Sequence, residues 1–288
     1  MTAEHLEYEL RTADGVKLAG QAWMPPDPRA VVAVVHGLAE HSGRYAFLAG
    51  RASQRGLGVV SADLRGHGRS PGERSYVERF DDYLQDADAL LAKAHALAAG
   101  RPVFLMGHSM GGAIALRWIA QRRQPVAGLI LSSAALKIGG DVPRLLVALA
   151  PLLSRWLPNL RGKRFDPAVI SRDAAAVAAY VGDPLVSLQA PPARTGAELL
   201  RAMAVNRAAA AGLTVPVYLL HGDADRLTDP AGSREIFDLW GGPDRTLRLW
   251  PGSRHETFND LDREAVAAEL LAWVLAHGQL PAGTCPAC

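Results

Sequence analysis

Short runs of apolar residues alternate along the chain with longer segments of helical periodicity. The apolar runs cover residues 30–37, 56–64, 102–107, 126–134, 215–222 and 245–252. Most of them lack the polar–apolar alternation of a half-exposed strand, which is typical of strands buried on both faces of a parallel sheet. The helical patterns lie around residues 43–55, 79–98, 111–123, 231–240 and 260–276. This alternation predicts an α/β fold with a mostly parallel, doubly wound sheet.

Two segments depart from this alternation. Polar and apolar residues alternate in LEYELRT and KLAGQAWM on either side of Asp14-Gly15, which predicts an N-terminal β-hairpin. From about Lys137 to Gln189 there is no convincing strand pattern, and we interpret this segment as a helical cap inserted over the carboxyl edge of the sheet. The predicted organisation is a first core part at 1–136, a cap at 137–190, a second core part at 191–277 and a tail at 278–288.

Composition and charge exclude several classes of protein. With 288 residues, 49% of them hydrophobic and 21% charged, the chain is typical of a globular protein with a substantial core. The formal net charge of +2, with no block of basic residues, argues against nucleic acid as a partner. The N-terminus is acidic and polar, unlike a signal peptide, and no apolar run reaches the length of a membrane span. We therefore expect a cytoplasmic protein.

The two cysteines, Cys285 and Cys288, lie in CPAC at the end of the chain. A C-x-x-C motif can be redox-active or can form half of a metal site, but here no helical pattern and no second ligand pair follow it. We interpret it as a frayed tail, and we expect neither a metal nor an organic cofactor.

Ser109 lies in PVFLMGHSMGGAIALRW, where an apolar run meets a helical pattern. The motif G-x-S-x-G between a strand and a helix indicates a nucleophile elbow. Gly107 and Gly111 fit such a tight turn because bulkier side chains would clash with neighbouring elements. The turn lifts the serine Oγ above the sheet edge and directs N–H groups of the helix toward the same point. Ser109 is therefore the candidate nucleophile.

A serine nucleophile needs a base and an acid, which follow the serine in the order acid, then histidine, in folds with this elbow. Three histidines follow Ser109, namely His221, His255 and His277. His255 lies in a loop between the last strand and the last helix, where a late base belongs, so we predict that it is the base. His221 is interpreted as a turn residue, and His277 lies at the end of the last helix.

The acid should follow the preceding strand, where LLHGDADRLTDP offers three aspartates. Periodicity does not distinguish them. Asp229 precedes Pro230 and resembles a helix N-cap, and Asp223 is close enough to the strand end to hold the turn. Asp225 is the remaining candidate, which we favour.

Two further glycine-rich turns follow predicted strands. His36-Gly37 ends one strand, so the backbone N–H of Leu38 can face the elbow and form an oxyanion hole with the N–H of Met110. The second turn, DLRGHGRSPG, contains His67, which could approach a substrate, but we interpret it as part of a structural loop.

Six stretches of the chain, HGLAEHSGRY, DLRGHGRSPG, GHSMGG, LPNL…ISRD…GDPLV, LHGDADRLTDP and PGSRHETFND, resemble the monoacylglycerol lipase family of serine hydrolases. The likeness runs from about Tyr8 to Trp273. It implies an α/β-hydrolase fold with a helical cap whose apolar lip meets lipid, and hydrolysis of monoacylglycerol to fatty acid and glycerol without a cofactor. The implied site residues are as follows: nucleophile Ser109, acid Asp225, base His255, and the oxyanion donors Leu38 and Met110.

The resemblance also places Glu40 and Arg44 in the loop beside the oxyanion hole, where we interpret them as structural. The family's mammalian members carry a regulatory cysteine after the acid, where this chain has Thr228, so thiol regulation is not expected. A lysophospholipase or broad carboxylesterase with the same triad is the alternative function. A more remote alternative is an aminopeptidase, which would need acidic residues in the cap, whereas the predicted cap is rich in arginine. Another is a non-catalytic binding protein, which would not react with a fluorophosphonate probe.

Overall fold

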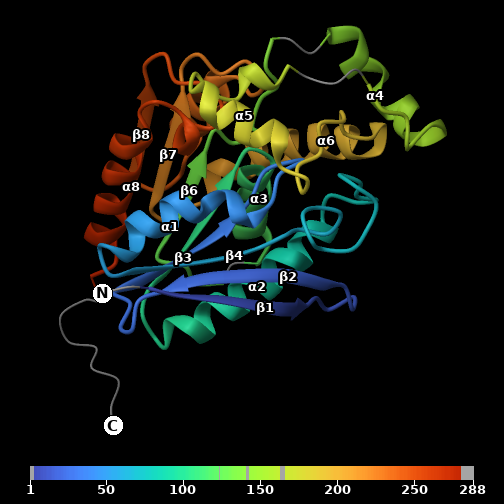
Figure 1. The fold of residues 1–288 in the computed structure, drawn as a ribbon. Helices are drawn as coiled ribbons and strands as arrows, with labels where there is room; N and C mark the ends of the chain where they lie inside the picture. The colour runs from blue at the N-terminus through green and yellow to red at the C-terminus, as the bar shows by residue number, and fades with distance from the viewer. Residues whose placement is uncertain (1–2, 123, 141–142, 163–165, 280–288) are drawn as a thin grey trace.

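The computed structural model describes residues 3–122, 124–140, 143–162 and 166–279. In this part of the chain an eight-stranded sheet has the order β1-β2-β4-β3-β5-β6-β7-β8 (Figure 1). Its strands are β1 (Glu4–Arg11), β2 (Lys17–Met24), β3 (Ala30–Val35), β4 (Leu57–Ala62), β5 (Val103–His108), β6 (Gly128–Ser132), β7 (Val217–Gly222) and β8 (Arg245–Trp250). The predicted hairpin is confirmed, since β1 pairs antiparallel with β2, and β2 pairs antiparallel with β4. From β4 to β8 the pairing is parallel, as predicted.

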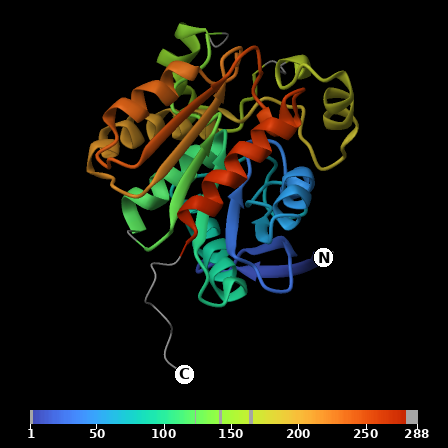
Figure 2. The same cartoon turned by 90° about the vertical axis from the view of Figure 1, so that its left-hand side faces the viewer.

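Helices cover both faces of this sheet. Figure 2 shows α8 (Arg263–His277) lying across one face beside α1 (Ala46–Ser53). The other face is covered by α2 (Asp82–Ala98), α3 (Met110–Arg122) and α7 (Pro230–Leu239). Successive side chains of a strand point to opposite faces, and in β3 Val31 and Val35 pack into one core cluster while Val32 and Val34 pack into the other. The uninterrupted apolar runs are therefore strands buried on both sides.

One predicted helix is divided in the structure. The pattern around 43–55 corresponds to a short 3-10 helix, η1 (Ser42–Tyr45), followed by α1. The side chain of His41 accepts a hydrogen bond from the Gly43 N–H and caps η1. Local capping by a side chain thus favours the tighter 3-10 turn of η1 at this point, and hydrophobic periodicity does not detect such capping.

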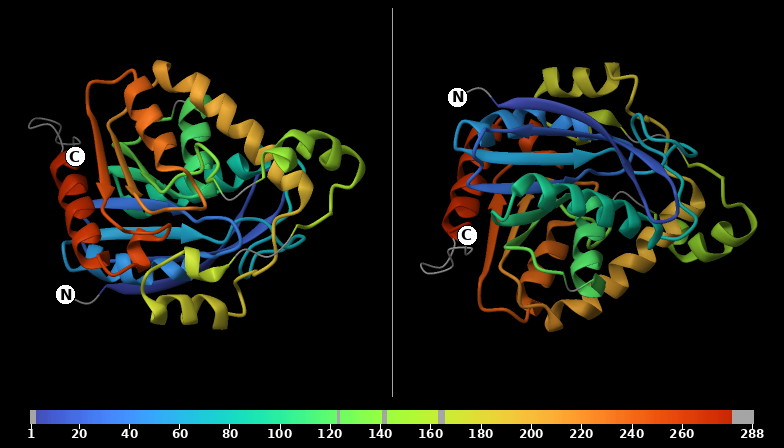
Figure 3. Two further views of the ribbon diagram at one scale, coloured as in Figure 1. Left: turned by 90° about the horizontal axis from the view of Figure 1, so that it is seen from above. Right: turned by 90° about the horizontal axis from the view of Figure 1, so that it is seen from below.

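The segment between β6 and β7 carries the inserted helices. In order these are α4 (Arg144–Trp156), η2 (Pro167–Val169), α5 (Ala174–Gly182), α6 (Ala193–Ala209) and η3 (Ala210–Gly212). Figure 3 shows α4 protruding from the body of the molecule. The long helix α6 contacts α4 and also packs on α3, where the Asn206 side-chain amide donates to the Ala113 carbonyl at 2.8 Å. Because α6 joins cap and core in this way, the exact boundary at residue 190 stays a prediction.

Within the described residues, no helix combines the length and the apolar character needed to cross a lipid bilayer. The sequence interpretation of Cys285 and Cys288 concerns residues that lie outside the described part of the chain.

Candidate active site

Ser109 lies between β5 and α3 in a left-handed backbone conformation, with φ of 53°. This conformation is unfavourable for a residue with a side chain, and such strain is held in place by surrounding contacts. The Ser109 N–H donates to the Ser132 carbonyl at 2.9 Å. A Cβ on Gly107 would lie 2.1 Å from the Gly111 carbonyl oxygen, and one on Gly111 would lie 2.1 Å from that of Val35. The glycines are therefore required by backbone packing around a half-buried serine.

His255 and Asp225 lie in loops that follow neighbouring parallel strands, β8 and β7. His255 Nδ1 is 2.7 Å from Asp225 Oδ2, and both side chains are buried. Burial by itself would raise the pKa of Asp225, but the charge of His255 and the hydrogen bonds from His221 and His255 hold it well below the ordinary value. Burial disfavours the charged form of His255, yet the carboxylate of Asp225 outweighs it and raises the histidine's pKa.

The other two aspartates of this segment have structural partners. The Asp223 Oδ1 atom accepts from the Gly252 N–H at 2.6 Å and joins the turns after β7 and β8. The Asp229 Oδ1 atom accepts from the Ala231 N–H at 2.9 Å and caps α7. Asp225 is therefore the aspartate of the three that the structure brings to His255.

The elbow is approached by the loop after β8 and the loop after β3. The His108 ring, next to Ser109 in the chain, lies 4.9 Å from the His255 ring, centroid to centroid. A Cβ on Gly37 would lie 3.1 Å from the Cβ of Ser109, so the loop after β3 passes close to the serine. Burial, and then the charge of His255, lower the pKa of His108 to about 4. His108 is thus an uncharged neighbour of the histidine that we predict to be the base.

Glu40 organises the loop after β3. Its Oε1 atom accepts from the Gly37 N–H at 2.6 Å and from the Tyr45 hydroxyl at 2.9 Å. Burial would raise the pKa of Glu40, but the positive charge that His108 carries only at low pH and the charge of Arg44 lower it to about 2, so the carboxylate stays ionised. These contacts shape the backbone just before Leu38, as the structural interpretation of Glu40 expects. The N–H of Met110 is the first of α3, at the helix end where N–H groups have no partner within the helix.

Three residues that sequence reasoning did not assign to the site also contact Asp225. His221, interpreted as a turn residue, places Nε2 3.0 Å from Asp225 Oδ2. The Thr228 hydroxyl donates to the same oxygen at 2.8 Å, and the Leu227 N–H donates to Oδ1 at 2.8 Å. The sequence contained one signal for these contacts, because all of these residues lie within eight positions at the end of one predicted strand.

The remaining candidate histidines lie elsewhere. The His67 ring is buried against those of His36 and Tyr83, and its Nδ1 is 3.0 Å from the Arg65 carbonyl oxygen. Burial lowers the pKa of His67 to about 3. It is a structural loop residue, as interpreted from the sequence. His277 on α8 contacts Asp244 at 3.1 Å.

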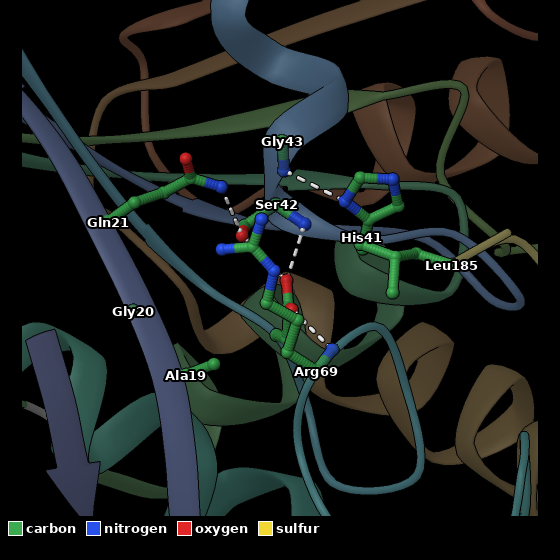
Figure 4. A pocket seen from close by; sticks show the side chains of 9 residues that line it. Ala19, Gly20, Gln21, His41, Ser42, Gly43, Arg69 and Leu185 are labelled. Carbon is green, nitrogen blue, oxygen red and sulfur yellow. Dashed lines mark hydrogen bonds between the residues drawn. The ribbon is translucent and has the colours of Figure 1, made fainter. Parts of the chain in front are cut away.

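Two hollows among the described residues are lined by groups other than the predicted triad. A small pocket of about 70 Å³ is lined by residues that include Gln21, Ser42 and Arg69, which Figure 4 shows around it. Its polar groups already bond one another, since the Gln21 amide donates to the Ser42 hydroxyl at 2.6 Å. A second hollow of about 470 Å³ lies between the β1–β2 turn and the loop before α2. Neither is lined by Ser109, Asp225 or His255.

The mostly parallel sheet, the serine elbow and the later aspartate and histidine loops define an α/β-hydrolase. A family model described as Serine aminopeptidase, S33, matches residues 26–262.

Individual relatives give a finer assignment. The chain is 35% identical to a monoacylglycerol lipase of Mycolicibacterium smegmatis over 272 residues, which cover 94% of this chain and 97% of the relative. It is 36% identical to the monoglyceride lipase of Homo sapiens over 281 residues, with coverage of 95% and 93%. The crystal structure of Paleococcus ferrophilus monoacylglycerol lipase matches with a TM-score of 0.82 and 34% identity, covering 90% of this chain and 99% of that one. The chain belongs to the monoacylglycerol lipase family.

Proposed function

We propose that the protein hydrolyses the acyl ester of monoacylglycerols and releases a free fatty acid and glycerol. The observation that carries the proposal is the 2.7 Å contact between His255 Nδ1 and Asp225 Oδ2 beside the strained elbow of Ser109. The names of the relatives, monoacylglycerol and monoglyceride lipases, support this choice of substrate.

In the proposed reaction, His255 takes the proton of Ser109 Oγ as that oxygen attacks the ester carbonyl carbon. The N–H groups of Leu38 and Met110 stabilise the oxyanion, while Asp225 holds the imidazole in the required tautomer and balances the imidazolium. The tetrahedral intermediate collapses, and the C–O bond to glycerol breaks. Glycerol leaves with the proton that His255 returns. Water, deprotonated by His255, then attacks the acyl carbonyl carbon of the acyl-enzyme. The second tetrahedral intermediate breaks its C–O bond to Ser109, whose oxygen takes the proton back from His255 as the fatty acid leaves.

The charges around the site suit these steps. The depressed pKa of Asp225 keeps the acid ionised, so it can stabilise the imidazolium without itself taking the proton. The low pKa of His108 avoids a second positive charge beside His255. Glu40 holds the Gly37 N–H, which fixes the loop that presents the Leu38 N–H before substrate arrives.

We further propose that α4 contacts the surface that carries the lipid substrate. Leu145 is 70% exposed and Trp156 is 69% exposed, and apolar side chains that are exposed together mark interaction surfaces. Leu149 and Leu152 are also exposed, and these four positions follow helical spacing along one face. An amphipathic helix of this kind can lie in a lipid interface with its apolar face buried.

The test is a comparison of initial hydrolysis rates with Ser109→Ala as the blank. The panel contains monoacylglycerols of increasing chain length, the matching lysophosphatidylcholines and an aminoacyl amide, because the matched family model is described as an aminopeptidase. We expect the highest kcat/KM for a monoacylglycerol. A preference for lysophosphatidylcholine would make the protein a lysophospholipase, and cleavage of the amide alone would make it a peptidase. No hydrolysis of any substrate would reject the enzymatic proposal.

A further inference from the structure

The carboxylate of Asp225 has two imidazole partners on one oxygen. Oδ2 lies 2.7 Å from His255 Nδ1 and 3.0 Å from His221 Nε2. The mechanism proposed above uses His255 and leaves His221 without a role. The side chain of His221 is fully buried at the end of β7, and the large majority of buried polar groups in proteins are hydrogen-bonded.

The partners of the two ring nitrogens identify the tautomer of His221. Its Nδ1 lies 2.7 Å from the hydroxyl of Ser233, a fully buried residue of α7. An ionised carboxylate only accepts hydrogen bonds, so His221 Nε2 must carry the proton that faces Asp225. In the uncharged ring Nδ1 is then an acceptor, and the Ser233 hydroxyl donates to it. The hydrogen bonds therefore run in one direction, from Ser233 through His221 to Asp225.

We propose that His221, oriented by Ser233, is a positioning residue that fixes the carboxylate of Asp225 and shares its negative charge. The proposal rests on the assignment of Asp225 and His255 under the proposed function. Each hydrogen-bond donor to Oδ2 reduces the stabilisation that this oxygen gives to the protonated ring of His255. The reason is that the positive end of the donor's dipole lies close to the imidazolium. His221 thereby prevents the acid from retaining His255 in its protonated, inactive form.

Other titratable groups also lie near His255. They are His108 from the end of β5, Glu256 next in the chain, and Glu40 from the loop after β3. Arg44 of η1 pairs with both carboxylates, Glu40 and Glu256. Within the described residues, His255 and Thr228 are the other side chains that bond the same oxygen as His221. The Thr228 hydroxyl also lies 3.0 Å from the Ser133 carbonyl, so its one proton is shared between two acceptors. His221 is therefore the donor whose removal should be felt most directly at Asp225.

The test uses His221→Leu, which removes the donor, and His221→Gln, whose side-chain amide can replace the Nε2–H. In His221→Leu we expect the acid limb of kcat/KM to move to higher pH by about half to one unit, and the plateau kcat to fall about tenfold, with KM unchanged. His221→Gln should restore both values to near those of the wild type. Ser233→Ala retains the imidazole but frees its tautomer, so it should move the limb in the same direction by less. His277→Leu, far from Asp225, is the control for loss of a histidine.

A measurement without turnover separates this inference from the proposed function. The imidazole proton resonances of His255, assigned by their loss in His255→Gln, are titrated in the Ser109→Ala enzyme with and without His221→Leu. A higher midpoint in the double variant supports the positioning role whatever the substrate is. An unchanged midpoint, or equal loss of activity in His221→Leu and His221→Gln, would make His221 a packing residue only. The proposed function fails by a different result, namely the absence of monoacylglycerol hydrolysis in the wild-type enzyme.

Discussion

Arg44 in η1 and Glu256 form an ion pair, with both side chains less than one-tenth exposed, that joins the segment after β3 to the loop that carries His255. Arg44 also donates to Glu40 at 3.2 Å, and its guanidinium lies 4.5 Å from the centre of the Tyr180 ring on α5. One cation thus connects the loop that presents the predicted oxyanion donor, the loop with the predicted base, and the cap. Because Glu40 bonds the Gly37 N–H, displacement of Arg44 would be transmitted to the backbone before Leu38.

Arg44→Met should destabilise the protein and slow catalysis. It leaves two buried carboxylates, Glu40 and Glu256, without their shared cation, and breaking such a pair costs about 3–5 kcal/mol. Burial already raises the pKa of Glu256 against the opposing charge of Arg44, so Glu256 should become protonated in the variant. The free energy of unfolding, measured with urea, should fall by that order. Arg44→Lys keeps the charge but lacks the planar guanidinium that can bond two carboxylates. Its free energy of unfolding should lie between those of the wild type and Arg44→Met. Equal stability of Arg44→Met and the wild type would contradict this account.

Gly37→Ala should lower kcat with little change in folding. The added Cβ would lie 2.9 Å from Glu40 Oε1 and 3.1 Å from the Cβ of Ser109, so the loop that presents the Leu38 N–H must move. Loss of one oxyanion donor typically lowers kcat by about 10²-fold. Gly50→Ala is the matched control, since a Cβ there meets nothing within 4 Å and alanine favours the helix α1. A full kcat in Gly37→Ala would place the oxyanion donor elsewhere.

Two of the three aspartates after β7, Asp225 and Asp223, should differ sharply in their effect on activity. Asp225→Asn keeps the shape but removes the charge that orients and stabilises His255, and the corresponding change in a known triad lowers kcat by about 10⁴-fold. Asp223→Asn, at the turn with Gly252, should retain most of the activity and lose some stability. Steady-state rates and urea unfolding of both variants test the assignment. If Asp223→Asn were the inactive variant, the acid would have been assigned wrongly.

The architecture was predictable because each signal is local. Apolar runs such as residues 30–37 predicted buried strands. The motif GHSMGG, at the end of the run that covers residues 102–107, located the elbow because the tight backbone turn depends on its neighbouring glycines. The contacts of Asp225 were less accessible, because periodicity places three aspartates at one strand end without saying which one faces His255.

The contacts of His221 could not be predicted for a related reason. A histidine before a glycine at a strand end is compatible with a turn, and its meaning depends on Ser233, which approaches from a helix twelve positions later. The pair Arg44 and Glu256 is separated by 212 positions and meets only through the fold. Burial and side-chain direction, which decide these contacts, are set by tertiary packing.

The pH dependence of kcat/KM should show an acid limb above the ordinary range of histidine. His255 must be uncharged to accept the Ser109 proton, so activity falls as the pH drops below its pKa. Burial acts to lower that pKa, but the charge of Asp225 raises it above the ordinary value of about 6.5. We therefore expect a limb midpoint above pH 6.5, and a lower midpoint for the residual activity of Asp225→Asn. A wild-type midpoint well below pH 6 would mean that another group controls the limb.

Removing apolar side chains from α4 should reduce activity on lipid surfaces and spare activity on soluble esters. In Leu145→Ser with Trp156→Ser, two side chains that are about 70% exposed no longer offer apolar area to a lipid interface. Each buried CH₂ contributes about 0.8 kcal/mol, so the double variant should bind vesicles at least tenfold more weakly. Sedimentation with lipid vesicles measures binding, while rates on a vesicle-borne monoacylglycerol and on a short soluble ester measure its consequence. Leu261→Ser, which removes a 64% exposed leucine just before α8, is the control. Equal loss of activity on both substrates would show that α4 supports the fold or the acyl pocket rather than a lipid surface.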